Sequence, residues 1–283
     1  MARRPFEEIR EKMLKSAKEG IKKAYTNEEY ALIQAINAYL ETSRSYNLLY
    51  ERLGEWYGIY FPEIRINNPK TLADLAIVLN DKSDLSKESI NSILNDEEKS
   101  EEILRKVNST IGRNMNSSEK DAVVKFAELS NQMNEALKGL EAYIKTTSNI
   151  LMPNATYLTD EKIAAELLSK AGSLERLATM PASTIQLLGA EKALFKHIKF
   201  GSKPPKYGIL FKLAAVGNAQ REHRGKMARV YATKISIALK ADYFSKNFIA
   251  DKLKKSLDIS VEKIKAKPIK EKSKQRTEKR YKK

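Results

Sequence analysis

The sequence predicts an all-α protein, in which a long antiparallel coiled coil with a helical tip insert precedes a globular helical domain and a disordered basic tail. Two seams of apolar residues, within 32–60 and 122–150, repeat at three- and four-residue steps over nearly equal lengths, as in helices that pair along their length. From Lys265 the chain is almost free of apolar residues, which is typical of a disordered segment. The expected parts are a linker helix at 1–25, the coiled coil at 26–153 with its tip insert at 62–117, the globular domain at 154–262 and a Lys-rich tail at 263–283.

The first expected helix covers residues 4–24. Pro5 suits the first position of a helix. Apolar residues recur on one face, whereas the other face mixes lysine with glutamate. Because a membrane-surface helix would carry mainly basic residues there, we expect the stripe to pack on a neighbouring helix. The stripe consists of Phe6, Ile9, Met13, Ala17 and Ile21.

Thr26 and Glu29 have the spacing of a capping box and predict the start of the first long helix, which Pro62 ends. Pro153 ends the second long helix in the same way. An antiparallel pair is the simplest arrangement, because two parallel helices would require the intervening chain to run back along the whole rod. The first seam is Leu32, Ala35, Tyr39, Thr42, Tyr46, Leu49, Leu53, Trp56 and Tyr60; the second is Ala122, Phe126, Leu129, Met133, Ala136, Leu140, Tyr143, Thr147 and Ile150.

The tip insert reads as three short helices, at 71–79, 86–94 and 98–112, separated by Asn-Asp and Asp-Lys turns. Its apolar residues include Leu75, Ile77, Val78 and Leu79. If they are exposed, they offer a surface on which a second copy of the chain can pair; otherwise they only cover the tip. Leu75, Val78 and Leu79 are the candidate dimerisation residues.

Further helices are expected in the globular domain. One covers 159–172, with Thr159 as its cap and Gly172 as its end, and a short turn follows at 173–178. A longer helix is expected from Pro181 through Lys199, where Ser183 and Gln186 resemble a capping box and Gly201 closes the helix. A stiff basic loop with two prolines, 203–206, leads to helices at 221–243 and about 245–265.

The composition excludes several classes of protein. There is no apolar run near twenty residues and no apolar leader, so we expect no membrane segment. Zero cysteines exclude disulfides and thiolate catalysis and fit a cytoplasmic protein. Phosphate-binding glycine loops and a nucleophile with its base are absent, and the two histidines, 26 positions apart, do not form a metal-ligand pair. We therefore expect no enzyme activity, no metal site and no cofactor.

The net charge of +16 is concentrated in the last third of the chain. Residues 189–240 hold 12 lysines and arginines against 2 acids, and residues 264–283 hold 10 against 2, whereas residues 1–188 sum to −3. Such segregation indicates that one end of the protein binds a polyanion. The alternative is a solvated, solubilising surface.

The candidate RNA-binding residues lie in this basic region. Lys192, Lys196 and Lys199 share one face of a helix, and several cations crowd the N-terminus of the next basic helix, where backbone amides also attract phosphate. A ring of His197, His223 or Tyr207 is expected to stack on an exposed base. The full set is Lys192, Lys196, His197, Lys199, Lys203, Lys206, Gln220, Arg221, His223, Arg224, Lys226 and Arg229.

At these residues the sequence resembles the Nop domain. The resemblance is carried by Met152-Pro153-Asn154, by 171–178, by 180–186, by Gly189–Phe195, by Pro204–Gly208 and by Arg224–Arg229, and it extends to 48–63 in the first long helix. It covers about residues 28–245. The chain is thus similar to the archaeal Nop-type core protein of box C/D guide-RNA particles, whose eukaryotic relatives are nucleolar.

The resemblance implies a non-catalytic scaffold for 2′-O-methylation of RNA. Its Nop domain would bind the composite surface of a kink-turn RNA and a small ribosomal-protein-like partner, and its coiled coil would form a homodimer. The family's N-terminal domain, which docks the methyltransferase fibrillarin, has no counterpart here, so fibrillarin is expected as a partner only if that domain is present elsewhere. Residues 218–223 also depart from the family pattern. The alternatives are a general basic RNA-binding or chaperone protein, a spliceosomal-type Nop-domain assembly factor, and a structural coiled-coil protein without RNA.

Overall fold

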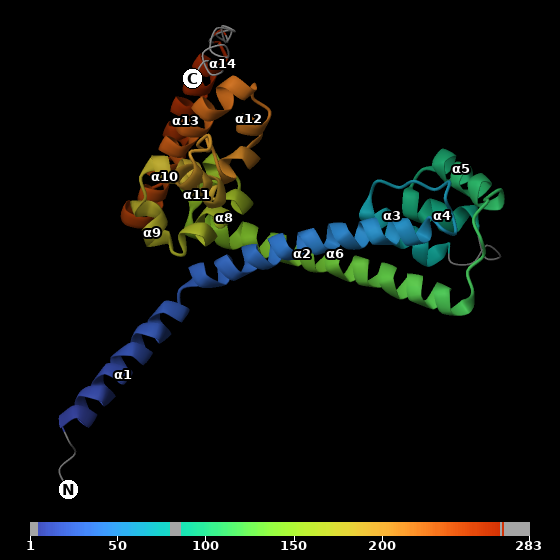
Figure 1. Ribbon diagram of the computed structural model, residues 1–283, viewed down its shortest axis with the longest axis horizontal. Helices are drawn as coiled ribbons and strands as arrows, with labels where there is room; N and C mark the ends of the chain where they lie inside the picture. Colours follow the sequence, from blue (N-terminus) through green and yellow to red (C-terminus); the bar gives the residue numbers. More distant parts are fainter. Residues whose placement is uncertain (1–4, 80–85, 267, 269–283) are drawn as a thin grey trace. The chain divides into compact units, whose positions relative to one another are not determined.

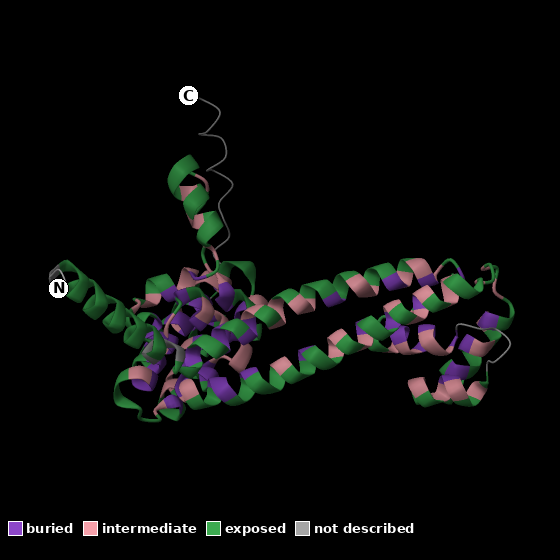
Figure 2. Cartoon of the chain, turned by 90° about the horizontal axis from the view of Figure 1, so that it is seen from below, coloured by how far each residue is buried: buried purple, intermediate pink, exposed green. Residues whose placement is uncertain are grey.

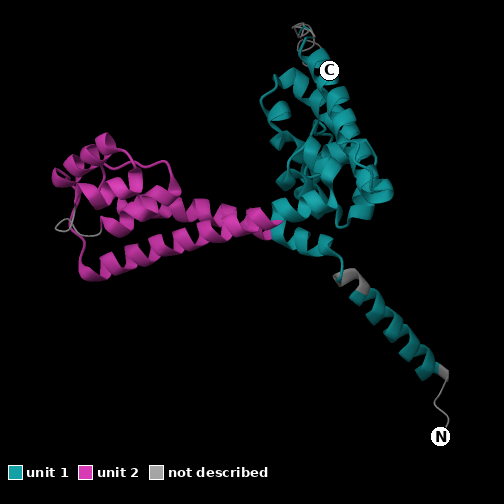
Figure 3. Cartoon of the chain, turned by 180° about the vertical axis from the view of Figure 1, so that it is seen from behind, with its two compact units in different colours: residues 1–36, 144–283 teal, residues 37–143 magenta. Residues whose placement is uncertain are grey.

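The computed structural model describes residues 5–79, 86–266 and 268, without the side chains of 5 and 23–25. Within these ranges all regular structure is helical, as predicted (Figure 1). The chain forms two compact units: unit 1 contains residues 1–36 and 144–283, and unit 2 contains residues 37–143 (Figure 3). The predicted basic tail lies almost wholly outside the described residues.

Helix α1, Pro5–Tyr25, forms where it was expected, but its apolar stripe is not covered. Phe6, Ile9, Met13 and Ile21 are 75, 57, 68 and 55% exposed, and α1 is exposed along its described length (Figure 2). The predicted packing of this stripe on a neighbouring helix is therefore wrong for the described part of the chain.

Helix α2, Glu28–Tyr57, begins next to the capping box predicted from Thr26 and Glu29. The side chain of Asn27 accepts a hydrogen bond from the Glu29 amide at 3.2 Å. The Glu29 carboxylate, which is buried, accepts one from the Leu174 amide at 2.9 Å. Leu174 is the first residue of another helix in unit 1, so Glu29 satisfies a free amide at the start of that helix.

In unit 2, α2 runs antiparallel to α6, Ser117–Leu151 (Figure 1). Leu53 and Tyr57 of α2 share a buried core with Val123 and Ala127 of α6, and the Trp56 and Phe126 rings lie 6.1 Å apart. The predicted antiparallel pairing is confirmed here, while a coiled coil along the whole seam stays a prediction.

The first predicted seam is buried or half-buried at all of its positions, but the second was placed one residue too early. Leu129, Tyr143 and Ile150 are 45, 42 and 66% exposed. The error has a physical cause, because two adjacent stripes of α6 repeat with the same heptad spacing, and the larger side chains belong to the outer one. The buried stripe is Val123, Ala127, Ser130, Leu137, Ile144 and Ser148; of the predicted seam, Thr147 is buried as well.

The tip insert contains the three expected helices, α3 (Pro69–Val78), α4 (Lys87–Leu94) and α5 (Glu97–Asn108). Leu75 and Leu79 are 0% exposed in the core of unit 2, and Val78 is half-buried. The expectation that Leu75 and Leu79 offer an exposed surface to a second copy is therefore wrong. Both residues face inward because the helices of the insert fold back on α2 and need a core of their own.

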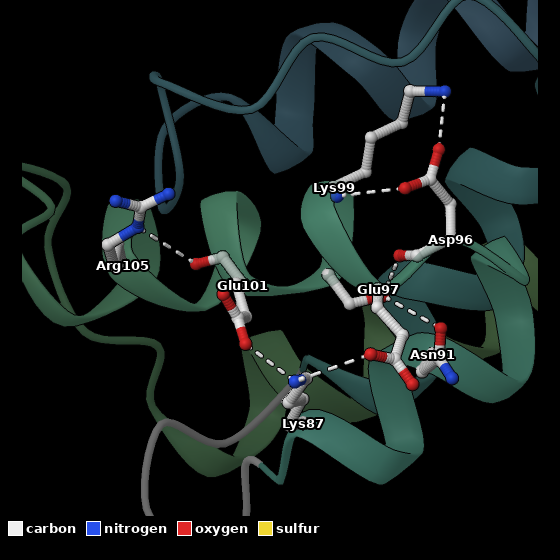
Figure 4. A network of polar contacts seen from close by, with 8 residues as sticks. Lys87, Asn91, Asp96, Glu97, Lys99, Glu101 and Arg105 are labelled. Atoms are coloured by element: carbon white, nitrogen blue, oxygen red, sulfur yellow. Dashed lines mark hydrogen bonds and ion pairs between the residues drawn. The ribbon is translucent and has the colours of Figure 1, made fainter.

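Ion pairs link side chains of α4 and α5 (Figure 4). Lys87 Nζ lies 2.5 Å from a Glu101 oxygen, and Lys99 Nζ lies 2.8 Å from an Asp96 oxygen. Asp96 also caps α5 by accepting a bond from the Lys99 amide at 3.1 Å. The basic side chains of this hairpin are thus engaged within the hairpin itself.

The rest of unit 1 is a helical domain built around α13, Arg221–Lys240. The buried face of α13 includes Met227, Tyr231, Ile235 and Leu239, and it packs on α7, α9, α10 and α14. The other elements are α7 (Pro153–Leu158), α8 (Glu161–Ala171), α9 (Leu174–Thr179), α10 (Ala182–Leu187), α11 (Glu191–Phe200), the 3-10 turn η1 (Ile209–Lys212), α12 (Ala214–Gly217), the π-helical turn η2 (Ala241–Ser245) and α14 (Ala250–Lys265).

The ends of α8 show which capping predictions hold. Gly172 takes a left-handed conformation, with φ of 88°, and ends the helix as predicted. Asp160, rather than Thr159, caps its start by accepting a bond from the Ile163 amide at 2.7 Å. Sequence spacing therefore located the helix but missed its cap by one residue.

A candidate RNA-binding head

Three segments of unit 1 carry the predicted RNA-binding residues: α11, the basic loop 201–208 and the first turns of α13. We call these three segments together the head. The single helix predicted from Pro181 through Lys199 is wrong, because Gly189 has a φ of 85° and divides it into α10 and α11. An L side chain is strained at this angle, and a Cβ on Gly189 would meet Ile209 Cγ1 at 2.6 Å.

Backbone hydrogen bonds fix the break between α10 and α11. The Gly208 amide donates to the Gln186 carbonyl at 2.9 Å, and the Ile209 amide donates to the Leu188 carbonyl at 2.7 Å. The predicted Ser183–Gln186 capping box does not form; instead the Gln186 amide nitrogen donates to the Lys206 carbonyl at 2.6 Å. These bonds join the basic loop to the end of α10. Gly201 closes α11 in a left-handed conformation, as predicted.

Eight cations of the head are exposed and have no carboxylate partner in the described part of the chain. Few acids are available there, since Glu191 and Glu222 are the only two within 189–240, and Glu191 accepts a bond from the Gly189 amide at 2.6 Å. A surface whose charge is not neutralised by its own acids attracts polyanions. These cations are Lys192, Lys196, Lys199, Lys203, Lys206, Arg221, Lys226 and Arg229.

Helix α11 also presents apolar side chains that the sequence analysis missed. It has no buried residue, and Phe195, Ile198 and Phe200 are 62, 74 and 67% exposed. Lys199 Nζ lies 5.8 and 5.4 Å from the ring centres of Phe195 and Phe200. From the sequence, Phe195 and Ile198 look like a core stripe, and only the break at Gly189 could have signalled that α11 leaves the core.

The two histidines lie in different environments. His223 is 4% exposed, so the predicted stacking of its ring on an RNA base is wrong for this conformation; its position on α13 turns it into the core beside Met227. His197 is half-buried at the end of α11, and its Nδ1 contacts the Ser202 carbonyl. Of the two rings, only that of His197 is partly accessible.

The Arg224 side chain is held in place by a hydrogen bond and an aromatic ring. Its Nε donates to the Ala219 carbonyl at 2.9 Å, and its guanidinium lies 5.3 Å from the Phe211 ring centre. The Phe211 ring stacks on Tyr207, with centres 5.0 Å apart and planes inclined by 12°. Tyr207, Phe211 and Arg224 therefore hold the basic loop, η1 and α13 together.

Gln220 occupies the N-cap position of α13 without a side-chain cap. Its carbonyl accepts bonds from the His223 and Arg224 amides at 2.8 and 3.1 Å. The start of α13 thus combines the positive end of a helix dipole with the exposed Arg221.

A pocket of about 480 Å³ opens between the basic loop and α13. Lys206, Lys226 and Arg229 supply three cations, and Glu222 one acid. Gly225 allows the close approach, since a Cβ there would meet Lys206 Cβ at 3.4 Å. The three cations outnumber the acid, so the charge of the lining favours an anionic ligand. The remaining lining residues are Ser183, Gln186, Leu187, Pro204 and Pro205.

Within the described residues, no group of three or more His, Cys, Asp or Glu side chains could hold a metal ion. None of the helices in this part of the chain is long and apolar enough to cross a membrane.

Comparison with known proteins places this geometry in a family. The family model "snoRNA binding domain, fibrillarin", named Nop, matches residues 38–263. An uncharacterised NOP5 family protein of Methanocaldococcus jannaschii is 37% identical over 268 residues, which are 93% of this chain and 64% of that protein. Nucleolar protein 56 of Dictyostelium discoideum is 36% identical over 222 residues, 76% of this chain and 41% of that protein. The chain thus spans less than two thirds of each of these two relatives.

A solved structure titled as a fibrillarin/Nop5p complex has the same fold. The match has a TM-score of 0.51 and 24% identity, and it covers 92% of this chain and 78% of the other. Because the family model matches most of the residues, including the head, the resemblance noted in the sequence is confirmed: the chain belongs to the Nop family.

Proposed function

We propose that this chain is a scaffold of a box C/D guide-RNA particle that directs 2′-O-methylation of RNA. The proposed ligand of the head is the composite surface formed by a kink-turn RNA and a small ribosomal-protein-like protein already bound to it. The family model, with its snoRNA-binding description, and the nucleolar relatives support this reading.

One observation carries the proposal: unpaired cations and exposed apolar side chains lie together on α11. Cations alone would suffice for RNA, because phosphates bind them without apolar contact. Exposed Phe195, Ile198 and Phe200 instead suit the partly apolar surface of a protein. A ligand made of RNA and protein uses both sets of side chains.

The proposed role is non-catalytic, with methyl transfer performed by fibrillarin. Fibrillarin enters the proposal only through an N-terminal domain outside these 283 residues. An archaeal cytoplasmic location is proposed, whereas the eukaryotic relatives are named as nucleolar.

Homodimerisation through unit 2 is a further part of the proposal. Of the three candidate residues, only Val78 is partly accessible, so the surface would have to use other groups besides Leu75 and Leu79. Light scattering of the wild-type chain over a range of concentrations tests the dimer; a monomer at all concentrations contradicts it.

The alternative with support in the sequence is a general RNA-binding or chaperone protein, which the Lys-rich tail would serve. A spliceosomal-type Nop-domain assembly factor would use the same head on another RNA. Deleting 264–283 separates scaffold from chaperone: the scaffold keeps its specific complex and loses mainly salt-sensitive affinity.

A gel-shift assay tests the main proposal. Box C/D RNA is titrated with the chain, with and without the kink-turn-binding protein. We expect a discrete complex only when both components are present. Equal affinity for naked RNA of any shape would refute the composite surface.

A further inference from the structure

A second exposed aromatic surface lies in unit 1, beyond the C-terminal end of α13, and the function proposed above does not use it. Phe244, Phe248 and Tyr157 are 63, 54 and 51% exposed. The Tyr243 and Phe244 rings lie 4.9 Å apart at 82°, and the Tyr157 and Phe248 rings lie 5.8 Å apart at 88°. We call residues 243–248 together with Tyr157 the aromatic loop. Because α13 has 20 residues, the loop lies roughly 30 Å from the N-terminal end of that helix.

A buried polar network holds this loop in place. The Asp242 carboxylate, 1% exposed, accepts bonds from the Asn154 amide at 2.9 Å, from Asn154 Nδ2 at 2.7 Å and from the Ala155 amide at 3.0 Å. Asn154 Nδ2 also donates to the Asn247 carbonyl at 2.9 Å, and the Ile249 amide donates to Asn154 Oδ1 at 2.7 Å. The network therefore ties both ends of the loop to the start of α7.

Two features of this loop are unfavourable for the free energy of folding. Burial raises the pKa of Asp242 above its ordinary value, because a carboxylate loses hydration there. Lys246 takes a left-handed conformation with φ of 57°, which disfavours a side chain. The buried network holds the loop in one conformation, although its aromatic side chains remain exposed to water. Departures from local consistency of this kind concentrate at functional sites.

The charge around the loop is positive. Lys246 Nζ lies 6.0 Å from the Tyr243 ring centre, and the surrounding stretch 240–255 has five lysines against two aspartates. Both aspartates are engaged, Asp242 in the buried network and Asp251 with the Tyr157 hydroxyl, whose pKa it raises. Four of the lysines have no carboxylate partner among the described residues: Lys240, Lys246, Lys252 and Lys255.

We propose that the aromatic loop binds single-stranded RNA, with bases stacked on Phe244 and Phe248 and phosphates held by Lys246 and Lys240. Exposed aromatic faces beside unpaired lysines are the elements of sequence-tolerant single-strand binding. An apolar protein partner would use the rings but would leave these cations without a counterpart. The proposal rests on the RNA-binding function above and adds a second contact at the far end of α13.

The test is fluorescence anisotropy with a labelled oligouridine, which forms no kink-turn, and the full chain. Stacking on aromatic side chains contributes about 1–3 kcal/mol per base, so Phe244→Ala/Phe248→Ala should weaken binding at least about tenfold. Lys246→Asn, which keeps a residue tolerant of the left-handed backbone, should weaken it less and reduce its salt dependence. Phe6→Ala, at a phenylalanine that is 75% exposed, is the matched control and should change nothing.

Crosslinking of 4-thiouridine, mapped by mass spectrometry, should place the RNA on Phe244 or Phe248. Unchanged oligouridine affinity in the double variant, with crosslinks elsewhere, would overturn the proposal. So would loss of a concentration-dependent dimer by that variant without loss of RNA binding.

The two RNA proposals fail separately. Phe244→Ala/Phe248→Ala should still form the ternary complex with kink-turn RNA and its protein if the head alone forms it. If that complex never forms but oligouridine binding still depends on Phe244 and Phe248, the composite-surface proposal fails and the aromatic loop stands.

Discussion

Residues 86–119 at the tip of unit 2 and the head of unit 1 both contain many charged side chains. The cations are paired with acids in the tip but not in the head. In the tip, Lys87, Lys99, Lys106 and Arg113 each pair with a carboxylate. In the head, eight cations have no such partner within the described residues. The local supply of acids explains the contrast, since residues 86–119 hold seven acids against five cations, whereas 189–240 hold two against 12. A balanced surface neutralises itself, and an unbalanced one attracts a polyanion.

Apolar side chains show the same contrast. Leu75 and Leu79 of α3 are 0% exposed, whereas Phe195 and Ile198 of α11 are 62 and 74% exposed. Helix α3 folds back on α2 and buries its stripe, while α11 follows the break at Gly189 and buries nothing. Similar sequence patterns are therefore buried in one unit and exposed in the other.

The largest expected effect concerns the buried tip. Leu75→Ala should lower the free energy of unfolding by about 2–5 kcal/mol, because it leaves a cavity in a closed core. Phe195→Ala should change it by less than about 0.5 kcal/mol, as exposed positions usually do. Urea denaturation followed by circular dichroism measures both. Similar losses in the two variants would contradict the assignment of Leu75 to the core and of Phe195 to the surface.

The joint before α11 gives the next effect. Gly189→Ala should cost about 1–3 kcal/mol, because a left-handed residue is strained and the new Cβ would meet Ile209. Gly139→Ala is the matched control: a Cβ at that helical glycine meets nothing within 4 Å, so it should stabilise by about 0.5–1 kcal/mol. Thermal unfolding distinguishes the two. A neutral Gly189→Ala would show that the break is not needed.

The salt dependence of RNA affinity tests whether the cations of the head, rather than the paired cations of the tip, contact phosphates. Lys192→Ala should reduce the slope of log affinity against log salt by roughly 0.7–0.9, the value for one lost phosphate contact. Lys106→Ala, which removes a paired lysine from the tip, should leave the slope unchanged. Isothermal titration of the kink-turn RNA complex at several salt concentrations measures both slopes. Equal slopes would mean that pairing does not decide which cations meet RNA.

The smallest effect is expected from the tip pairs themselves. Lys106 lowers the pKa of Glu102 through their hydrogen bond. A lowered pKa in the folded state means that the pair stabilises the protein above the unfolded pKa and loses this contribution as the pH falls through the folded pKa. Lys106→Met should raise the pKa of Glu102 toward its ordinary value and leave stability almost unchanged, because solvent screens an exposed pair. Carboxyl NMR titration checks the shift; an unchanged pKa would mean the pair does not form in solution.

Much of the fold could be predicted because periodicity and proline positions mark helices. The two long helices, the three tip helices and the cations of the head followed from spacing and charge. Tertiary context decided the rest. Glu29 caps another helix, His223 turns into the core, and the break at Gly189 depends on the approach of Ile209 from a later segment. Sequence spacing cannot report such contacts, because their partners lie far along the chain.

We propose that the exposed cations of the head, and not charge in general, bind the RNA–protein surface. The direct measurement compares two double charge reversals in the ternary assembly with kink-turn RNA and its protein partner. Lys192→Glu/Lys196→Glu should weaken assembly at least tenfold, or about 1.4 kcal/mol, while Lys99→Glu/Lys106→Glu in the tip should leave it intact. Equal weakening by both pairs, or none by the head pair, would contradict the claim.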